Sequence, residues 1–358
     1  MRGGTDVSEN IHKRKTDIVF LNILFCLLVM FIHVASEIVT KMPKDTYVFK
    51  TVFSAHRLSS FVVQGFILLS GVKFFLHKRN NINYFKYYSS RIFRVVIPYI
   101  IWVIIYYLYF CSKNYFDFSL SDLMHHIIRG DLSAHFYFVI ILVQFDILAP
   151  LWMALFKRGN VAVHIAFSLI LTVIASQYLM PILTTVFPSM PNINLDNCFL
   201  RYQIYWTAGC MIGIHYGEFQ NYLKSNKIYI IISFLFCAAA NVVLTNATVE
   251  HFPVWLDFIH IMYCIAAILF FYMISQLFAG AGGKILMPLS LVDKSSYSIY
   301  LIHCIVLVMT DFAMTDHGIT SLTARFGIRT ASVYGISIGL CLVWQIVKYP
   351  FAKMIRKS

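Results

Sequence analysis

One histidine and one glutamate lie in the first long apolar run of the chain, at a spacing suited to general base chemistry. The run from Asp17 to Val39 is long enough to cross a lipid bilayer. Because ionisable side chains are costly in that environment, His33 is by default a functional-site candidate. Glu37 lies one helical turn beyond it, so we expect its carboxylate to hydrogen-bond the imidazole and fix the tautomer. Alternatively, neighbouring helices satisfy both side chains, or Glu37 is simply an interfacial residue.

A pair of arginines is the second candidate. Arg91 and Arg94 are one turn apart, just before the third apolar run and after the aromatic and basic stretch 84–88. Two guanidinium groups on one helical face make a good phosphate clamp. Ordinary anchoring at the membrane interface is the competing interpretation.

Other polar residues fall within apolar runs. Ser70 and the glycine after it are small, so their first expected role is close helix packing. Ser296, Tyr300 and His303 share a helical face, where structural hydrogen bonds between helices explain them as well as chemistry does. Asp146 lies in mid-helix and must be paired, protonated or facing a cavity.

The sequence lacks the usual motifs of metal and nucleotide chemistry. It contains no His-Glu-x-x-His, Cys-x-x-Cys, Walker loop or Gly-x-Gly-x-x-Gly. Asp257 and His260 can share a face, but no third ligand accompanies them. The eight cysteines lie mostly within apolar runs, which is typical of small core residues. We therefore expect no metal site, no permanently bound cofactor and no disulfide framework.

The composition indicates what must position these residues. The 358-residue chain is 59% hydrophobic and only 13% charged, with a mean hydropathy of +0.72, far from soluble proteins. A formal charge of +13 can signal nucleic-acid binding, but here the basic residues are scattered between apolar runs and serve to orient helices. The expected fold is therefore an all-α polytopic membrane bundle in contact with lipid, with no nucleic-acid partner.

Ten apolar runs approach the length of a membrane span. They lie near 17–39, 53–76, 95–111, 135–156, 161–183, 202–217, 227–245, 256–279, 295–314 and 330–351. An even number of crossings puts both termini on one side. The segments that are then internal hold 19 lysines and arginines, and the external ones hold nine, so both termini are expected in the cytoplasm. This gives an N-terminal tail (1–16), a transmembrane domain (17–351) and a basic C-terminal tail (352–358).

Five short patterns occur in order along these runs, and together they resemble the acyltransferase 3 family of integral membrane enzymes, which O-acylate cell-envelope glycans. The patterns are Asn22 with His33 eleven positions later, Phe66-Ile-Leu-Leu-Ser70-Gly71, Arg91-Ile-Phe-Arg94-Val-Val-Ile-Pro98, His135-Phe-Tyr-Phe138 with Pro150, and Tyr297-Ser-Ile-Tyr300-Leu-Ile-His303. The resemblance extends from about residue 17 to 351.

The resemblance implies a reaction and a set of site residues. An acyl-CoA, most commonly acetyl-CoA, is the expected co-substrate from the cytoplasm. The acceptor is a hydroxyl of an envelope glycan or lipid-linked sugar outside a bacterial cytoplasmic membrane. His33 is expected to act as general base with Glu37 orienting it, or to carry the acyl group transiently. The acyl-CoA site is expected to comprise Arg91, Arg94, Ser70, Tyr300 and His303.

One departure and two other function classes stay open. The family carries arginine where this chain has Asn22, which indicates a divergent subgroup, a different acyl donor or reduced activity. The first rival is a transporter or polysaccharide-export component, because Asp146 and His303 suit a proton path. Against it, the sequence shows no inverted repeat and no paired broken helices. The second is a scaffold without catalysis.

Overall fold

The structure is a computed structural model that describes residues 3–76, 82–156, 160–186, 197–278 and 283–355. Throughout these residues the regular structure is helical, and none of it is β-strand. The all-α fold class expected from the sequence is confirmed. The chain divides into two compact units, each described by itself: unit 1 comprises Met1–Phe66 and Asn221–Ser358, and unit 2 comprises Ile67–Gln220.

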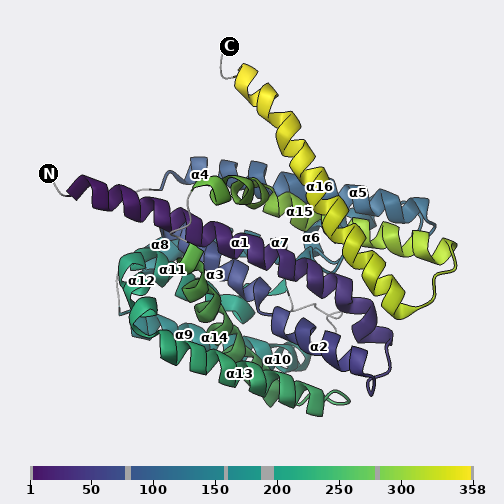
Figure 1. Cartoon of the computed structure of the whole chain (residues 1–358), viewed down its shortest axis with the longest axis horizontal. Coiled ribbons are helices and arrows are strands. Elements are labelled where there is room, and N and C mark those ends of the chain that lie inside the picture. The colour runs from purple at the N-terminus through teal and green to yellow at the C-terminus, as the bar shows by residue number, and fades with distance from the viewer. Residues whose placement is uncertain (1–2, 77–81, 157–159, 187–196, 279–282, 356–358) are drawn as a thin grey trace. The chain divides into compact units, whose positions relative to one another are not determined.

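Unit 1 is built around its first helix. In Figure 1, α1 (purple) lies beside α15 and α16, and it also packs against α2 and α14. Buried side chains of α1, α15 and α16, among them Met30, Ile299 and Val333, form one apolar core. The helices of this unit are α1 (Gly3–Lys41), α2 (Tyr47–Ser59), α13 (Lys227–Ala247), α14 (Trp255–Phe278), α15 (Gly283–Asp316) and α16 (Leu322–Ile355). Helices α3 (Val62–Leu76) and α12 (Tyr216–Ser225) are shared between the units.

Unit 2 surrounds a short buried helix, α11. The ring of Trp206 on α11 stacks on Phe145 of α7 at 4.5 Å, and the backbone N–H of Ile204 donates to Thr172 of α9. The elements of this unit are α4 (Tyr84–Arg91), the π-helical turn η1 (Ile92–Val96), α5 (Ile97–Ser112), α6 (Leu120–Arg129), α7 (Tyr137–Ile147), α8 (Ala149–Phe156), α9 (Val161–Gln177), α10 (Leu179–Val186), the 3₁₀ turn η3 (Phe199–Tyr202) and α11 (Gln203–Ile214).

Glycines bring α11 and α3 into backbone contact. A Cβ atom on Gly209 would lie 2.1 Å from the carbonyl oxygen of Leu68, and one on Gly71 would lie 2.7 Å from that of Trp206. Side chains at these positions would force the helices apart, so the small residues are required by packing. The packing role expected at the Ser70-Gly71 step is thus observed for Gly71.

A proline breaks the fourth expected span. Helices α7 and α8 meet at Leu148 with a bend of 58°. Pro150, the second residue of α8, has no N–H to donate to the carbonyl one turn back, and its ring disfavours a continuous helix there.

Seven helical segments of the described chain are long and apolar enough to cross a membrane, and the bent α7–α8 pair would make an eighth. The expected runs at 161–183 and 202–217 correspond to α9 and α11, with 17 and 12 residues. The count of ten and the side of the termini stay predictions. Exposed apolar stripes with helical spacing, such as Val163, Phe167 and Ile170 on α9, are the faces that lipid would cover.

The close approach of α3 and α11 predicts a specific intolerance. Gly209→Ala should lower the free energy of unfolding by about 1–3 kcal/mol, because the new methyl group meets backbone that cannot rotate away. Gly217→Ala is the matched control, since nothing lies within 4 Å of its Cβ position. Denaturant unfolding in detergent micelles measures both variants. Equal stability of the two would contradict this packing.

Candidate active site

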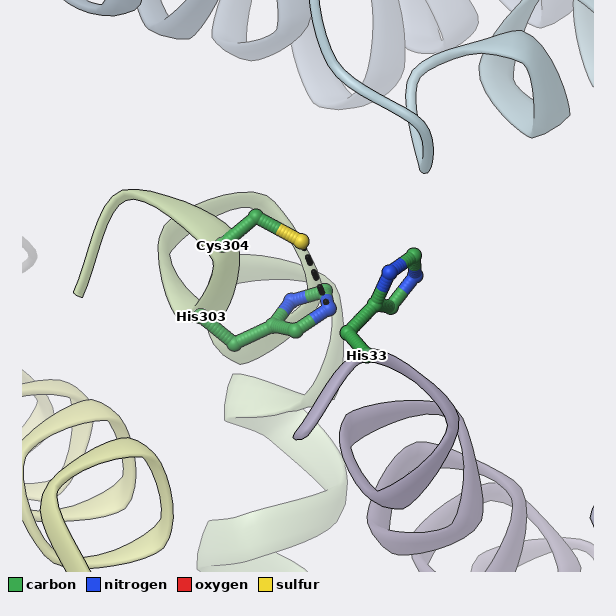
Figure 2. A group of neighbouring side chains, drawn as sticks. All are labelled: His33, His303 and Cys304. Atoms are coloured by element: carbon green, nitrogen blue, oxygen red, sulfur yellow. Dashed lines mark hydrogen bonds between the residues drawn. The ribbon is translucent and has the colours of Figure 1, made fainter. Parts of the chain in front are cut away.

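Two imidazoles lie side by side on neighbouring helices of unit 1. The ring centroids of His33 on α1 and His303 on α15 are 5.1 Å apart, and the thiol of Cys304 lies beside them (Figure 2). His303 and Cys304 are buried, whereas His33 is half-buried. His56 of α2 is within electrostatic reach of His33. The structure therefore unites two of the predicted site residues, and the fully buried ring belongs to His303.

The tautomer of His303 follows from its backbone partner. Its Nδ1 atom lies 2.6 Å from the carbonyl oxygen of Tyr300, and because a carbonyl can only accept, Nδ1 must carry the proton. The unprotonated Nε2 then faces the Cys304 sulfur at 3.3 Å. Tyr300, another predicted site residue, is buried with its ring 5.8 Å from that of His303.

Helices α1 and α15 run parallel through this region. Asn22 donates to the carboxylate of Asp293 at 2.7 Å, and His33 lies beside His303 about three helical turns further along both helices. Parallel directions agree with the first and ninth of ten spans. At the position where the family resemblance expects arginine, a neutral amide therefore holds a carboxylate that an arginine would neutralise.

The expected hydrogen bond between Glu37 and His33 is not formed within the described residues. The Glu37 carboxylate instead accepts from the Arg325 Nε at 2.9 Å and from Lys41 at 2.9 Å, and it lies 3.3 Å from the Arg329 Nε. Charge-assisted bonds to guanidinium groups are stronger than a bond to a neutral imidazole, which explains the choice. Glu37 therefore anchors helices and does not orient the His33 ring.

A buried ion network joins α1, α15 and α16. Glu37, Arg325 and Arg329 are 6%, 8% and 6% exposed, and Arg329 also donates to Asp311 of α15 at 2.7 Å. With the partly exposed Asp311, these two arginines and two carboxylates have a formal net charge of zero. Arg329 also donates to the backbone carbonyl of Val34 at 3.3 Å, so the network is hydrogen-bonded to the residue that follows His33.

Arg325 and Arg329 belong to the nine external basic residues of the sequence and Cys304 to its eight cysteines, and none of the three was a predicted site residue. Their spacing held a usable signal for the arginines, because two of them one turn apart in an apolar helix need carboxylate partners. No local signal pointed to Cys304.

A second polar group of unit 1 joins α2, α13 and α14. Arg57 donates to Asn241 at 3.2 Å. His260 contacts the thiol of Cys264 at 3.4 Å and the hydroxyl of Ser60 at 3.5 Å. Asp257 is exposed and lies within electrostatic reach of Arg57, and no hydrogen bond joins it to His260 among the described residues.

In unit 2 the two predicted phosphate-binding arginines do not form one clamp. Arg91 lies 3.2 Å from the Asp146 carboxylate and over the ring of Tyr87, whose hydroxyl also donates to Asp146. Arg94 lies in the π-helical turn η1, is exposed, and makes no hydrogen bond or ion pair with the part of the chain described. The residue spacing alone did not predict this π-helical turn, which interrupts the regular α-helix between the two arginines. Asp146 is thus the paired mid-span carboxylate that the sequence required.

The ion network predicts that Glu37 matters for stability. Glu37→Gln should lower the free energy of unfolding by about 3–5 kcal/mol, because two buried guanidiniums would share only Asp311. The matched control is Glu250→Gln, which breaks the exposed pair with Lys44 and should cost at most about 1 kcal/mol. Denaturant titration in micelles compares them. A Glu37 variant as stable as the control would refute the role of this network.

The comparison with protein families adds the wider context. Residues 18–346 match the acyltransferase 3 family, described as an acyltransferase domain. Neither the search of curated proteins nor that of solved structures gave a match. The matched range contains every site residue described above and covers nearly the whole chain. With its apolar helices, this protein therefore belongs to the acyltransferase 3 family, as a multi-pass membrane acyltransferase.

Proposed function

We propose that this acyltransferase moves an acyl group, most simply acetyl, from cytoplasmic acyl-CoA to a hydroxyl of a cell-envelope glycan or lipid-linked sugar. The proposed location is the bacterial cytoplasmic membrane. His33 is the general base. The observation that carries the proposal is the half-buried His33 beside a second imidazole inside an apolar helix pair of an acyltransferase chain.

The imidazole of His33 has the chemistry that hydroxyl acylation needs. In its neutral form it carries one unprotonated nitrogen that can take the proton of the attacking hydroxyl. The hydroxyl oxygen then forms a bond to the thioester carbonyl, the carbon–sulfur bond breaks, and coenzyme A leaves as a thiol after taking up the proton. In the alternative route His33 first carries the acyl group, and the hydroxyl attacks that acyl-imidazole.

Fixed backbone supports this role. The guanidinium of Arg329 binds the carbonyl of Val34, and the hydroxyl of Tyr334 donates to the carbonyl of Leu27 at 2.7 Å. These contacts tie α1 to α16 on both sides of His33. The backbone that carries the base is therefore held in place before the substrates bind, which lowers the entropic cost of bringing base and hydroxyl together.

Arg94 is the better candidate for the phosphates of the donor. Arg94 is exposed and lies at the end of a segment that is expected in the cytoplasm. The guanidinium of Arg91, in contrast, forms an ion pair with Asp146. π-Helical turns frequently accompany functional sites, and η1 contains Arg94. We therefore assign donor binding to Arg94, and Arg91 keeps the helix that carries it in place. Ser70 of unit 2, and Tyr300 and His303 of unit 1, remain proposed acyl-CoA-binding residues.

No observation favours the transporter alternative. Asp146, which suited a proton path, is held by Arg91 and Tyr87 and is accounted for as a structural counter-ion. His303 is accounted for by its bond to the Tyr300 carbonyl.

Replacing His33 tests the proposed base. His33→Ala should reduce acylation of envelope glycans by about 10²–10⁴-fold, because the hydroxyl would lose its proton acceptor. Base-labile acyl groups on isolated glycans are measured by mass spectrometry, with membrane abundance determined in parallel. His251→Ala, an exposed histidine, is the control and should leave acylation unchanged. Normal acylation by an abundant His33 variant would remove this residue from the mechanism.

Separate roles for the two arginines give another prediction. Arg94→Ala should weaken acetyl-CoA binding by about 10–100-fold, as expected for loss of a charge-assisted bond, while stability is kept. Arg91→Ala should instead lower stability, because Asp146 would lose its cation.

Binding to the micelle-solubilised protein and its unfolding midpoint are measured for both variants. Wild-type affinity in the Arg94 variant would mean that this residue is only an interfacial anchor.

A further inference from the structure

We propose that His33, His303 and Cys304 form a binding site for a transition metal ion such as Zn²⁺. The three side chains offer two imidazole nitrogens and one sulfur, and these atoms all lie within 4.8 Å of one another (Figure 2). Imidazole and thiolate are the ligands that Zn²⁺ prefers, and three of them leave the fourth tetrahedral position open.

The geometry of His303 and Cys304 is already that of two ligands. Zn–N and Zn–S bonds of about 2.0 and 2.3 Å put the two atoms about 3.5 Å apart in a tetrahedral site. The Nε2 and Sγ atoms are 3.3 Å apart, so an ion can bind both with almost no rearrangement.

The other ring nitrogen of His303 has the partner that metal ligands usually have. Metal-binding histidines donate their second ring N–H to a carbonyl or carboxylate, which fixes the tautomer with the lone pair on the ligating atom. The Nδ1 of His303 donates to the Tyr300 carbonyl at 2.6 Å, and Nε2 is thereby the ligating nitrogen. The backbone of α15 therefore prepares this ring for an ion.

His33 closes the triad from α1. Two nitrogens on one tetrahedral ion are about 3.3 Å apart, so its ring nitrogen needs to approach by at most about 1.5 Å. His303 and Cys304 are buried and already at ligand distance from each other, so the remaining approach is made by His33, which is half-buried. Apolar residues on both helices, among them Val34 and Val306, limit water around the ligands and so strengthen binding.

An ion at this site would block acyl transfer. Binding removes the proton of the Cys304 thiol and takes the lone pair that His33 needs as a base. This regulatory consequence rests on the proposed function, whereas metal binding by the triad does not. A transferase under this control is active only while the triad is free of metal.

Cobalt and zinc binding to the full chain in detergent, after chelation of metals, test the site. Co²⁺ should give tetrahedral visible absorption with a thiolate charge-transfer band, and titration with Zn²⁺ should displace it at one equivalent. Cys304→Ser should abolish the thiolate band and weaken Zn²⁺ binding by at least about 100-fold, because a direct ligand is lost. His33→Asn should weaken Zn²⁺ binding by a similar factor and leave the thiolate band in place.

Cys264→Ser is the matched control. Cys264 is also buried and also lies beside one histidine, at 3.4 Å, but among the residues that the structure describes it belongs to no group of three possible metal ligands. This variant should bind both ions as the wild type does. Wild-type protein without a thiolate band, or a Cys304 variant with wild-type affinity for zinc, would overturn the site. The wild-type spectrum decides even if a variant does not fold.

Acyl transfer measured with and without Zn²⁺ separates the site from the function. Zinc at one equivalent should abolish transfer by the wild type, and a chelator should restore it. In the Cys304 variant, whatever activity remains should lose this sensitivity. Zinc bound by a metal-free protein that acylates no glycan would support the site and refute the proposed function. Transfer without any zinc binding would refute the site alone.

Discussion

The buried pairing of Glu37 and Asp311 with Arg325 and Arg329 is the constraint on which the candidate site depends. Three of these groups, Glu37, Arg325 and Arg329, are buried, and a buried charge is stable only when it is paired with an opposite charge. The four charges cancel, which permits their burial. Because they come from α1, α15 and α16, the three helices cannot separate without exposing unpaired charge to an apolar medium. His33 lies one helical turn before Glu37 on α1, so the ion network also fixes the position of the backbone at His33.

The length of the apolar runs was sufficient to predict an all-α membrane fold. The run at 17–39 lies within α1, whereas the run at 135–156 was expected to be continuous and is bent near Pro150, whose missing N–H explains the break. The buried helix α11 was harder to interpret. Its glycines shortened the apolar signal, yet they are needed for contact with α3. A span defined by hydropathy alone therefore says little about a helix that touches protein on every side.

Partner choice is what local spacing could not reveal. An i, i+4 relation made His33 the nearest candidate for Glu37, but Arg325 follows 288 residues later and binds more strongly. Arg91 likewise looked like a partner of Arg94 until Asp146 supplied a counter-charge. In both cases a carboxylate pairs with a guanidinium group that is distant in the sequence. Glu37 and Arg91 were candidates because they are charged, and for the same reason each is paired within the fold and is not available for the proposed chemistry.

The juxtaposition of His33 and His303 imposes a chemical choice on the site. Two neutral imidazoles at this distance present lone pairs in a region with little water, and protonating both would place like charges side by side. Only one of them can therefore act as a base at a time. Because the Nδ1 of His303 donates to the Tyr300 carbonyl, its lone pair is on Nε2, which faces the Cys304 sulfur. His33 is half-buried whereas His303 is buried, so an incoming hydroxyl can reach the His33 ring more readily, and we assign its proton to His33.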